Sequence, residues 1–203
     1  MNEDEAREWV SERFDDAAVD RLTKLASIVI AENARQNLVA PSTLDSIWSR
    51  HIGDSLQLVR FAGVGAWLDI GTGAGFPGLA IAAAEPDRAM LLVEPRRLRA
   101  DYLRTAAEAL ELPRVRVVTA KVENVRERAA TISARAVAKI ATLFDAAEHC
   151  AENGTVWVLP KGRSAADEVA EAGRMWHGVF HVEHSITSPD SAIVVAHALR
   201  RRR

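Results

Sequence analysis

The stretch that decides the fold is WLDIGTGAGFPG at residues 67–78, followed directly by LAIAAA at residues 79–84. Residues 67–70 form a short apolar run typical of a buried strand, and residues 79–84 favour a helix. Between them, three alternate glycines permit positive φ angles and carry no Cβ atoms that would keep a ligand off the backbone. Ligands of open α/β sheets bind at the carboxyl ends of the strands. The stretch therefore predicts a nucleotide-like ligand over Gly71 to Gly75.

Apolar runs and helical segments alternate downstream of this stretch, which favours a parallel sheet covered on both faces. One expected helix has an apolar face made of Leu98, Tyr102, Leu103, Ala106 and Leu110. The last two expected strands have no long helix between them, so they should pair antiparallel. The predicted fold is α/β, a doubly wound and mostly parallel seven-stranded sheet with an antiparallel edge strand. Strands are expected at residues 67–70, 90–93, 115–118, 131–134, 155–159, 181–186 and 192–196.

Upstream, residues 1 to about 61 have helical periodicity. One buried face is predicted by the spacing of Leu22, Leu25, Ala26 and Val29. Pro41 interrupts this helix, and a second apolar stripe runs from Leu44 to Val59. We expect residues 1–62 to form an N-terminal helical extension packed on the core, and residues 63–203 to form the ligand-binding domain.

Composition narrows the class of protein. The chain has 203 residues and a formal net charge of −2; its first 20 residues carry a net −6, which leaves +4 for the rest. Because no run approaches 18 apolar residues, a membrane span is not expected. The single cysteine cannot form an internal disulfide, and the acidic N-terminus lacks the apolar core of a secretory signal. These features predict a cytoplasmic protein, and its mildly basic body permits a nucleic-acid partner.

The glycine pattern leaves two classes of ligand open. Gly73, Gly75 and Gly78 formally match the GxGxxG pattern of dinucleotide-binding proteins. The glycine that closes directly on the strand is Gly71, however, and counted from there the spacing is that of S-adenosylmethionine-dependent methyltransferases. Glu94, at the end of the next strand, can accept hydrogen bonds from ribose hydroxyls in either class. An NAD(P)-binding oxidoreductase therefore remains an alternative.

Further residues resemble a known family. They are Asn37-Leu38, Arg50-His51-Ile52-x-Asp54-Ser55, the loop ending in Phe76-Pro77-Gly78, Lys121-Val122-Glu123, Arg135-Ala136 and Lys161-Gly162. On these residues the chain is similar to the bacterial 16S ribosomal RNA guanine-N7 methyltransferases called RsmG, also named glucose-inhibited division protein B (GidB). The resemblance implies a class I S-adenosylmethionine-dependent methyltransferase fold with an N-terminal helical cap.

The resemblance also implies the composition of the site. The cofactor is S-adenosylmethionine, which becomes S-adenosylhomocysteine, and no metal is expected. The partner is 16S rRNA or the small ribosomal subunit, the chain is expected to be a monomer, and no membrane is involved. Arg135 and Lys161 are the candidate catalytic residues, expected to orient the base or its phosphate. The candidate cofactor-binding residues are Gly71, Gly73, Gly75, Phe76, Glu94, Val122, Glu123 and Arg135.

The residues after the fourth expected strand bear on the chemistry. Methyltransferases of exocyclic amines commonly carry an Asn/Asp-Pro-Pro-aromatic run there, whereas this chain has Ser133-Ala134-Arg135-Ala136. Guanine N7 is a lone-pair acceptor without a proton, so its methylation requires positioning rather than a general base. Because the major groove of A-form RNA is closed to side chains, the target guanine should be exposed. Candidate phosphate contacts are Arg96, Arg97, Arg99, Arg104, Arg135, Lys161 and the tail of arginines at 200–203.

Other hypotheses stay open at this point. The same donor could serve a small-molecule acceptor, which predicts turnover without RNA. A non-catalytic RNA-binding module would not need the glycine loop. His177, His181 and His184 lie close in sequence, but few carboxylates stand at ligand spacing around them, and we do not expect a metal site there.

Overall fold

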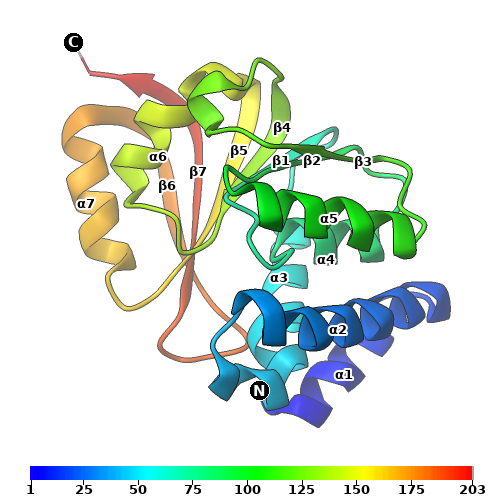
Figure 1. Cartoon of the computed structure of the whole chain (residues 1–203). Helices are drawn as coiled ribbons and strands as arrows, with labels where there is room; N and C mark the ends of the chain where they lie inside the picture. The colour runs from blue at the N-terminus through cyan, green and yellow to red at the C-terminus, as the bar shows by residue number, and fades with distance from the viewer. Residues whose placement is uncertain (203) are drawn as a thin grey trace.

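A computed structural model describes residues 1–202 of the chain, and the strands within this range form a single seven-stranded sheet (Figure 1). The strand order is β3-β2-β1-β4-β5-β7-β6. The first five strands in this order are parallel, and β7 runs antiparallel to both of its neighbours, β5 and β6. The predicted fold class is confirmed. The strands are β1 (Trp67–Ile70), β2 (Met90–Val93), β3 (Val115–Val118), β4 (Ala129–Ala134), β5 (Ala151–Lys161), β6 (Trp176–His184) and β7 (Ala192–Arg201).

Strands β1 to β3 have the predicted bounds, whereas the later strands are longer than predicted. The prediction of a strand over residues 181–186 is wrong at both ends, since β6 covers Trp176–His184. Its first residues pair with the end of β7, Trp176 opposite Arg201. Beyond its end, Ser185 and the backbone of Ile186 bond to the side chain of Gln57 in the helical extension instead of continuing the ladder.

Helices cover both faces of the sheet, as a doubly wound fold requires (Figure 1). On one face, α4 (Gly78–Ala84) and α5 (Arg97–Ala109) bury residues such as Leu79 and Leu103 in one core. On the other, α6 (Ile140–Ala147) and α7 (Ala165–Met175) enclose Phe144, which packs edge-on against Trp157 at 4.9 Å between ring centroids. The prediction that Leu98 lies on the buried face of α5 is wrong, because its side chain is 66% exposed in the first turn of the helix.

Local signals define the first two helices. In α1 (Glu3–Ser11), Asn2 and Glu5 form a reciprocal capping box. The helix α2 (Asp16–Gln36) starts at the Asp15 cap and ends at Asn37, whose φ of 48° is left-handed. Its predicted face is buried, as expected: Leu22, Leu25, Ala26 and Val29 all lie in the core.

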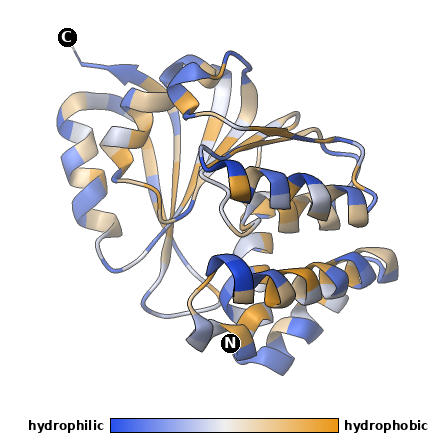
Figure 2. Ribbon diagram, in the orientation of Figure 1, coloured by the Kyte–Doolittle hydropathy of each residue, from blue (hydrophilic) through white to orange (hydrophobic). Residues whose placement is uncertain are grey.

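The second apolar stripe forms a series of short helical pieces instead of one helix. They include a 3₁₀ turn at Pro41–Ser46, a π-helical turn at Trp48–Gly53, α3 (Asp54–Leu56) and a 3₁₀ turn at Val59–Phe61. The residues of this segment and those of α1, α2 and α4 share one continuous hydrophobic core, in which Trp48 and Leu25 are buried. Figure 2 shows hydrophobic residues along the strands and alternating hydrophobic and hydrophilic residues along α2. The domain boundary between residues 62 and 63 stays a prediction.

Candidate active site

The glycine loop lies at the carboxyl end of β1, beside the end of β2. Gly71, Gly73 and Gly75 have φ angles of 66°, 58° and 100°, which side chains other than glycine adopt at a cost. The backbone N–H of Gly71 donates to the carbonyl of Val93 at 2.7 Å, so the loop begins by folding onto β2. The three glycines predicted to line the ligand site therefore stand together as bare backbone.

A buried carboxylate anchors the two ends of this loop. Asp69 is fully buried, and its Oδ2 accepts from the backbone N–H of Gly78 at 3.0 Å. Its Oδ1 accepts from Ser133 Oγ at 2.6 Å, and that hydroxyl accepts from Trp67 Nε1 at 2.8 Å. Burial raises the pKa of Asp69 to about 6, although its hydrogen bonds oppose the shift.

Glu94 contacts the same loop from the end of β2. Its Oε2 accepts from the N–H of Gly73 at 3.0 Å, and its Oε1 accepts from the N–H of Arg96 at 2.9 Å. The side chain is buried, at 3% exposure. Since a carboxylate oxygen can accept more than one hydrogen bond, Glu94 still has capacity for a ligand hydroxyl.

The next strand brings two further candidates toward this edge. Val122 and Glu123 lie in a 3₁₀ turn (Val122–Asn124) that follows β3. Val122 is buried in the core under α6, and Glu123 is exposed. The adjacent carboxyl ends of β1, β2 and β3 thus carry the glycines, an acid and an apolar residue in the order that the sequence predicts.

Phe76, His51 and Arg135 form a stack at the other side of the loop. The rings of His51 and Phe76 lie 5.1 Å apart at 20°, and the guanidinium of Arg135 lies 5.4 Å from the centroid of Phe76. Phe76 is 3% exposed, so its buried ring is a surface on which His51 and Arg135 pack.

Arg135 follows β4 and is held by two residues of the π-helical turn and by Asp54, the first residue of α3. Its Nη1 donates to Asp54 Oδ2 at 3.3 Å and to the carbonyl of Arg50 at 3.4 Å, and its Nη2 lies 3.1 Å from His51 Nδ1. Burial lowers the pKa of the Arg135 guanidinium, and the Asp54 carboxylate opposes that shift. Arginine nevertheless stays protonated in proteins.

The hydrogen bonds of His51 define its tautomer. Because Arg135 can only donate, Nδ1 of His51 must accept, and the proton resides on Nε2. That Nε2–H donates to Thr43 Oγ1 at 2.8 Å, and Thr43 donates in turn to the carbonyl of Ala40 at 2.7 Å. Burial, together with the charge of Arg135, lowers the pKa of His51 to about 3, so the ring is neutral at physiological pH.

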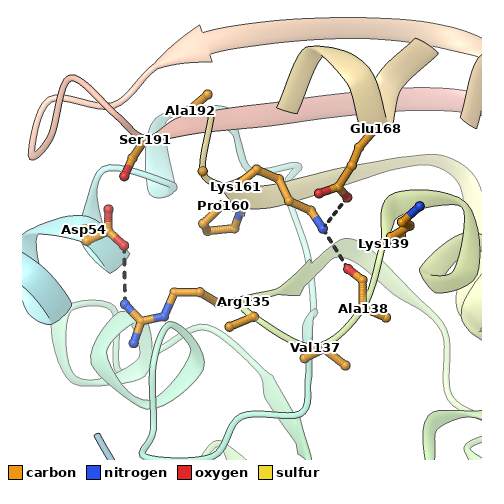
Figure 3. A pocket seen from close by; sticks show the side chains of 12 residues that line it. Asp54, Arg135, Val137, Ala138, Lys139, Pro160, Lys161, Glu168, Ser191 and Ala192 are labelled. Carbon is orange, nitrogen blue, oxygen red and sulfur yellow. Dashed lines mark hydrogen bonds and ion pairs between the residues drawn. The ribbon is translucent and has the colours of Figure 1, made fainter. Parts of the chain in front are cut away.

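A pocket of about 520 Å³ opens at the carboxyl ends of β4 and β5 (Figure 3). Arg135 and Asp54 lie at one side of it, and Lys161 lies at the other (Figure 3). The ammonium of Lys161 is bound to Glu168 at 2.8 Å and to the carbonyl of Ala138 at 2.7 Å. The structure therefore brings the two predicted catalytic residues into one pocket, each paired with a carboxylate.

The predicted phosphate contacts divide into two groups. The first group, Arg96, Arg97 and Arg99, comes shortly after Glu94 in the sequence. Arg99 lies beside the glycine loop, because a Cβ on Gly73 would be 3.8 Å from Arg99 Nη1. Arg104 lies further along α5 and binds Asp101 and Thr119.

The arginine tail does not fit this role beside the pocket. Arg200 and Arg201 belong to β7, whose first residue, Ala192, lines the pocket, so they lie at the opposite end of the strand. Arg201 pairs with Asp145 at 3.2 Å, and Arg202 donates to the carbonyl of Gly173. Arg203 lies outside the described residues.

Two further features of residues 1–202 bear on other classes of site. No group of three or more His, Cys, Asp or Glu side chains in this range is placed to hold a metal ion. His181 of the histidine group stacks on His197, with ring centroids 6.3 Å apart. Within the same range, no helix has both the length and the apolar character to cross a membrane.

Comparison with known proteins identifies the family. The model of a family described as rRNA small subunit methyltransferase G (GidB) matches residues 18–191. The chain belongs to this family.

Relatives of high similarity carry the same name. The protein of Novosphingobium aromaticivorans named ribosomal RNA small subunit methyltransferase G is 47% identical over 98% of this chain and 90% of its own. That of Erythrobacter litoralis, with the same name, is 44% identical over 95% of each chain. Among solved structures, a glycopeptide N-methyltransferase complexed with S-adenosylmethionine is similar with a TM-score of 0.61 at 12% identity, over 72% of this chain and 93% of that one. This likeness concerns the fold.

Several residues in and next to the pocket of this GidB family member were not predicted as parts of the site. Asp54 and His51 belong to a sequence motif, but nothing in that motif indicates that they bind Arg135. Glu168, which pairs with Lys161, and Thr187, which donates to Asp54 at 2.9 Å, carried no signal of their own. The spacing of His51 and Asp54, three residues apart, could have shown that they share a helical face.

Proposed function

We propose that this member of the GidB family transfers the methyl group of S-adenosylmethionine to N7 of a guanine in the 16S rRNA of the small ribosomal subunit. The observation that carries the N7 assignment is that Asp54 and Glu168, the carboxylates of the pocket, are both engaged by cations. Proton uptake by either carboxylate would break its ion pair, so neither stands free to act as a general base. N7 has no proton to remove, so the pocket suits this acceptor better than an amine.

The residues at the ends of β1 to β3 fit an S-adenosylmethionine molecule. Side chains at Gly71, Gly73 and Gly75 would be strained at their positive φ angles, and a Cβ on Gly71 would lie 2.7 Å from a methyl group of Val137, so the conformation and packing of this loop depend on glycine. We assign the ribose hydroxyls to Glu94, and the adenine to the neighbourhood of Val122 and Glu123. Phe76 supports the boundary between this half of the site and the acceptor pocket.

The transfer balances without a base. When bound, S-adenosylmethionine supplies an electrophilic methyl carbon on a sulfonium. The N7 lone pair of guanine forms the new N–C bond as the C–S bond breaks, and the bonding pair stays on sulfur in S-adenosylhomocysteine. The positive charge passes to the purine, and no proton leaves. The chain's contribution is to hold N7 in line with the methyl group, which can be worth an effective molarity on the order of 10⁵–10⁸ M.

In this scheme Arg135 and Lys161 orient the acceptor nucleotide from two sides of the pocket. Arg135 stands between the glycine loop and the pocket, so it contacts both donor and acceptor. Arg96, Arg97 and Arg99 lie beside the donor half, where they can bind phosphates of the flanking RNA. Binding should then weaken steeply with salt, because each phosphate contact releases counterions. We also propose that the chain acts as a cytoplasmic monomer.

The test is transfer of a labelled methyl group to small ribosomal subunits from cells that lack this enzyme. We expect label in 16S rRNA, with the modified guanine detected by reduction and aniline cleavage, to which 7-methylguanosine is sensitive. Label at an amine or carbon of the base would overturn the N7 assignment. Turnover of small molecules without RNA would favour the alternative acceptor, and binding of NAD instead of S-adenosylmethionine in calorimetry would refute the donor.

A further inference from the structure

Three segments far apart in sequence meet at one carboxylate. Asp54 Oδ2 accepts from Arg135, and Asp54 Oδ1 accepts from Thr187 Oγ1 at 2.9 Å and from Gln57 Nε2 at 3.0 Å. Thr187 belongs to the connection between β6 and β7, whose last residue, Ser191, lines the pocket. Figure 1 shows this connection reaching the helical extension. Asp54 therefore ties the extension to both the β4 side and the β7 side of the acceptor pocket.

The π-helical turn and Asp54, the residue that follows it, present three acceptors to a single guanidinium. The carbonyl of Arg50, Nδ1 of His51 and Oδ2 of Asp54 all lie within hydrogen-bond distance of Arg135. Single π-helical turns are frequent at functional sites because they alter which groups share a face. The start of this turn is itself fixed from a distance: the carboxylate of Glu3 accepts from the N–H groups of Trp48 and Ser49 at 2.9 and 3.0 Å.

These contacts leave part of Arg135 available. An arginine side chain has five N–H donors in a rigid plane. Two are directed at the π-helical turn and one at Asp54, and among residues 1–202 the Nε–H and the second Nη2–H have no hydrogen-bond partner. Arg135 lines the pocket, and its guanidinium also rests against Phe76. Because these contacts fix the plane of the Arg135 guanidinium, they also fix the directions in which its two remaining N–H groups point.

The Asp54 carboxylate also offsets the positive charge of Arg135. In the proposed transfer the purine becomes positively charged, and an isolated guanidinium beside it would oppose that change. Asp54 lies 3.3 Å from Arg135, with side-chain exposures of 17% and 19%, so the pair has little net charge in a partly desolvated place. The donors of Arg135 can therefore act on the nucleotide at a reduced electrostatic cost in the transition state.

We propose that Asp54 and His51 are positioning residues for methyl transfer: they orient Arg135 so that its free N–H groups bind an oxygen acceptor of the target nucleotide. This inference rests on the proposed function and assigns a role in it to the helical extension. The same two residues would otherwise serve the fold alone, by joining the extension to the sheet.

A double-mutant cycle separates these two roles. Asp54→Asn should lower kcat on the order of 10- to 100-fold with small ribosomal subunits that lack the methyl group, since misplacing a catalytic group by about 1 Å can cost a hundredfold. The S-adenosylmethionine Kd should stay within about threefold of wild type. In an Arg135→Ala background, Asp54→Asn should have little further effect on kcat, because the two residues act as a unit.

A matched pair at the histidine repeats the test. His51→Asn retains an acceptor near the position of Nδ1, whereas His51→Leu removes it. We expect His51→Asn to keep most of the turnover and His51→Leu to lose it, again only when Arg135 is present. Asp45→Asn, an exposed aspartate of the preceding turn, is the surface control and should match wild type. If Asp54→Asn fails to fold, the histidine pair carries the cycle.

The outcomes are distinct. Wild-type kcat in both Asp54→Asn and His51→Leu would overturn the proposal, and so would losses that persist unchanged in the Arg135→Ala background, because they would mark a structural role. If instead the wild-type chain transfers no methyl group to N7, the proposed function itself fails.

Discussion

The donor half and the acceptor half of this site are built by different means. The donor half is mainly backbone: the loop at residues 71–78 lies next to β2, and Asp69 and Glu94 bind its N–H groups. The acceptor half is mainly side chains, gathered from residues 54, 135, 161 and 168. A cofactor of fixed shape can be held by a local loop, whereas an RNA acceptor needs charged groups oriented from several directions. The two halves should therefore fail in different ways when they are mutated.

The largest effect is expected from Arg135→Ala. It removes the guanidinium that faces the acceptor pocket and leaves Asp54 unpaired, so turnover should fall on the order of 10²–10³-fold, as for other positioned charged groups. Affinity for S-adenosylmethionine should change far less, by a few-fold at most. Single-turnover methylation and calorimetry measure the two quantities. Equal losses in both would mean that the two halves are not separable at this residue.

Gly78→Ala should distort the glycine loop of the donor half, because a methyl group at this position does not fit the packing around it. A Cβ at this position would lie 2.5 Å from Leu92 Cδ2 and 2.8 Å from Asp69, so the loop anchor must shift. We expect a stability loss of about 1–3 kcal/mol in denaturant unfolding, together with weaker S-adenosylmethionine binding. Gly173→Ala is the matched control, since a Cβ in that helix meets nothing within 4 Å and should be neutral or slightly stabilising. Similar stability of the two variants would refute the packing argument.

Glu94→Gln should weaken the donor half without a packing change. The glutamine carbonyl can accept from either Gly73 or Arg96, but its amide group would face the other N–H donor. Because hydrogen bonds to charged groups contribute about 1.5–3 kcal/mol, S-adenosylmethionine affinity should fall tenfold or more by calorimetry. The exposed Glu108 on α5 supplies the control Glu108→Gln. An unchanged affinity in Glu94→Gln would remove this residue from the ribose site.

The effect that is smallest near neutral pH comes from His51, whose titration should not occur in the folded protein. His51 has a pKa of about 3, well below the ordinary 6.5, so NMR should show a neutral Nε2–H ring down to about pH 4. In the unfolded chain the ring takes up a proton near pH 6.5. Its contribution to stability is therefore complete above pH 6.5 and is lost as pH falls toward 3, at up to about 1.4 kcal/mol per pH unit.

Comparison of wild type with His51→Asn isolates this contribution, because Asp69 and the other groups are common to both. The stability difference should move in favour of His51→Asn as the pH is lowered from 6.5 to 4.5 in urea unfolding. A parallel pH dependence for the two proteins would show that the acceptor half does not hold this ring neutral.

The first strands and the donor half could be predicted because their signals are local. Buried parallel strands are short apolar runs, and β1, β2 and β3 have the predicted bounds. The spacing of the alternating glycines, and of the acid after the next strand, is enough to predict a ligand site at this edge of the sheet. The bounds of β6 could not be predicted, because the three residues after the buried Trp176 are exposed at the sheet edge. The end of the strand depends on Gln57, more than a hundred residues away.

The sequence by itself determined the doubly wound fold, the position of the glycine loop and, through its motifs, the family. The tertiary structure alone decided what Arg135 and Lys161 are paired with, and that the arginines of β7 lie at the far end of the strand from the pocket. It also decided that a π-helical turn supplies two of the three acceptors that hold the Arg135 guanidinium. The reason is physical. Periodicity and glycine spacing act over a few residues, whereas the partner of a buried charge is the group that packing brings within a few ångströms, and such packing joins residues with no fixed relation in sequence.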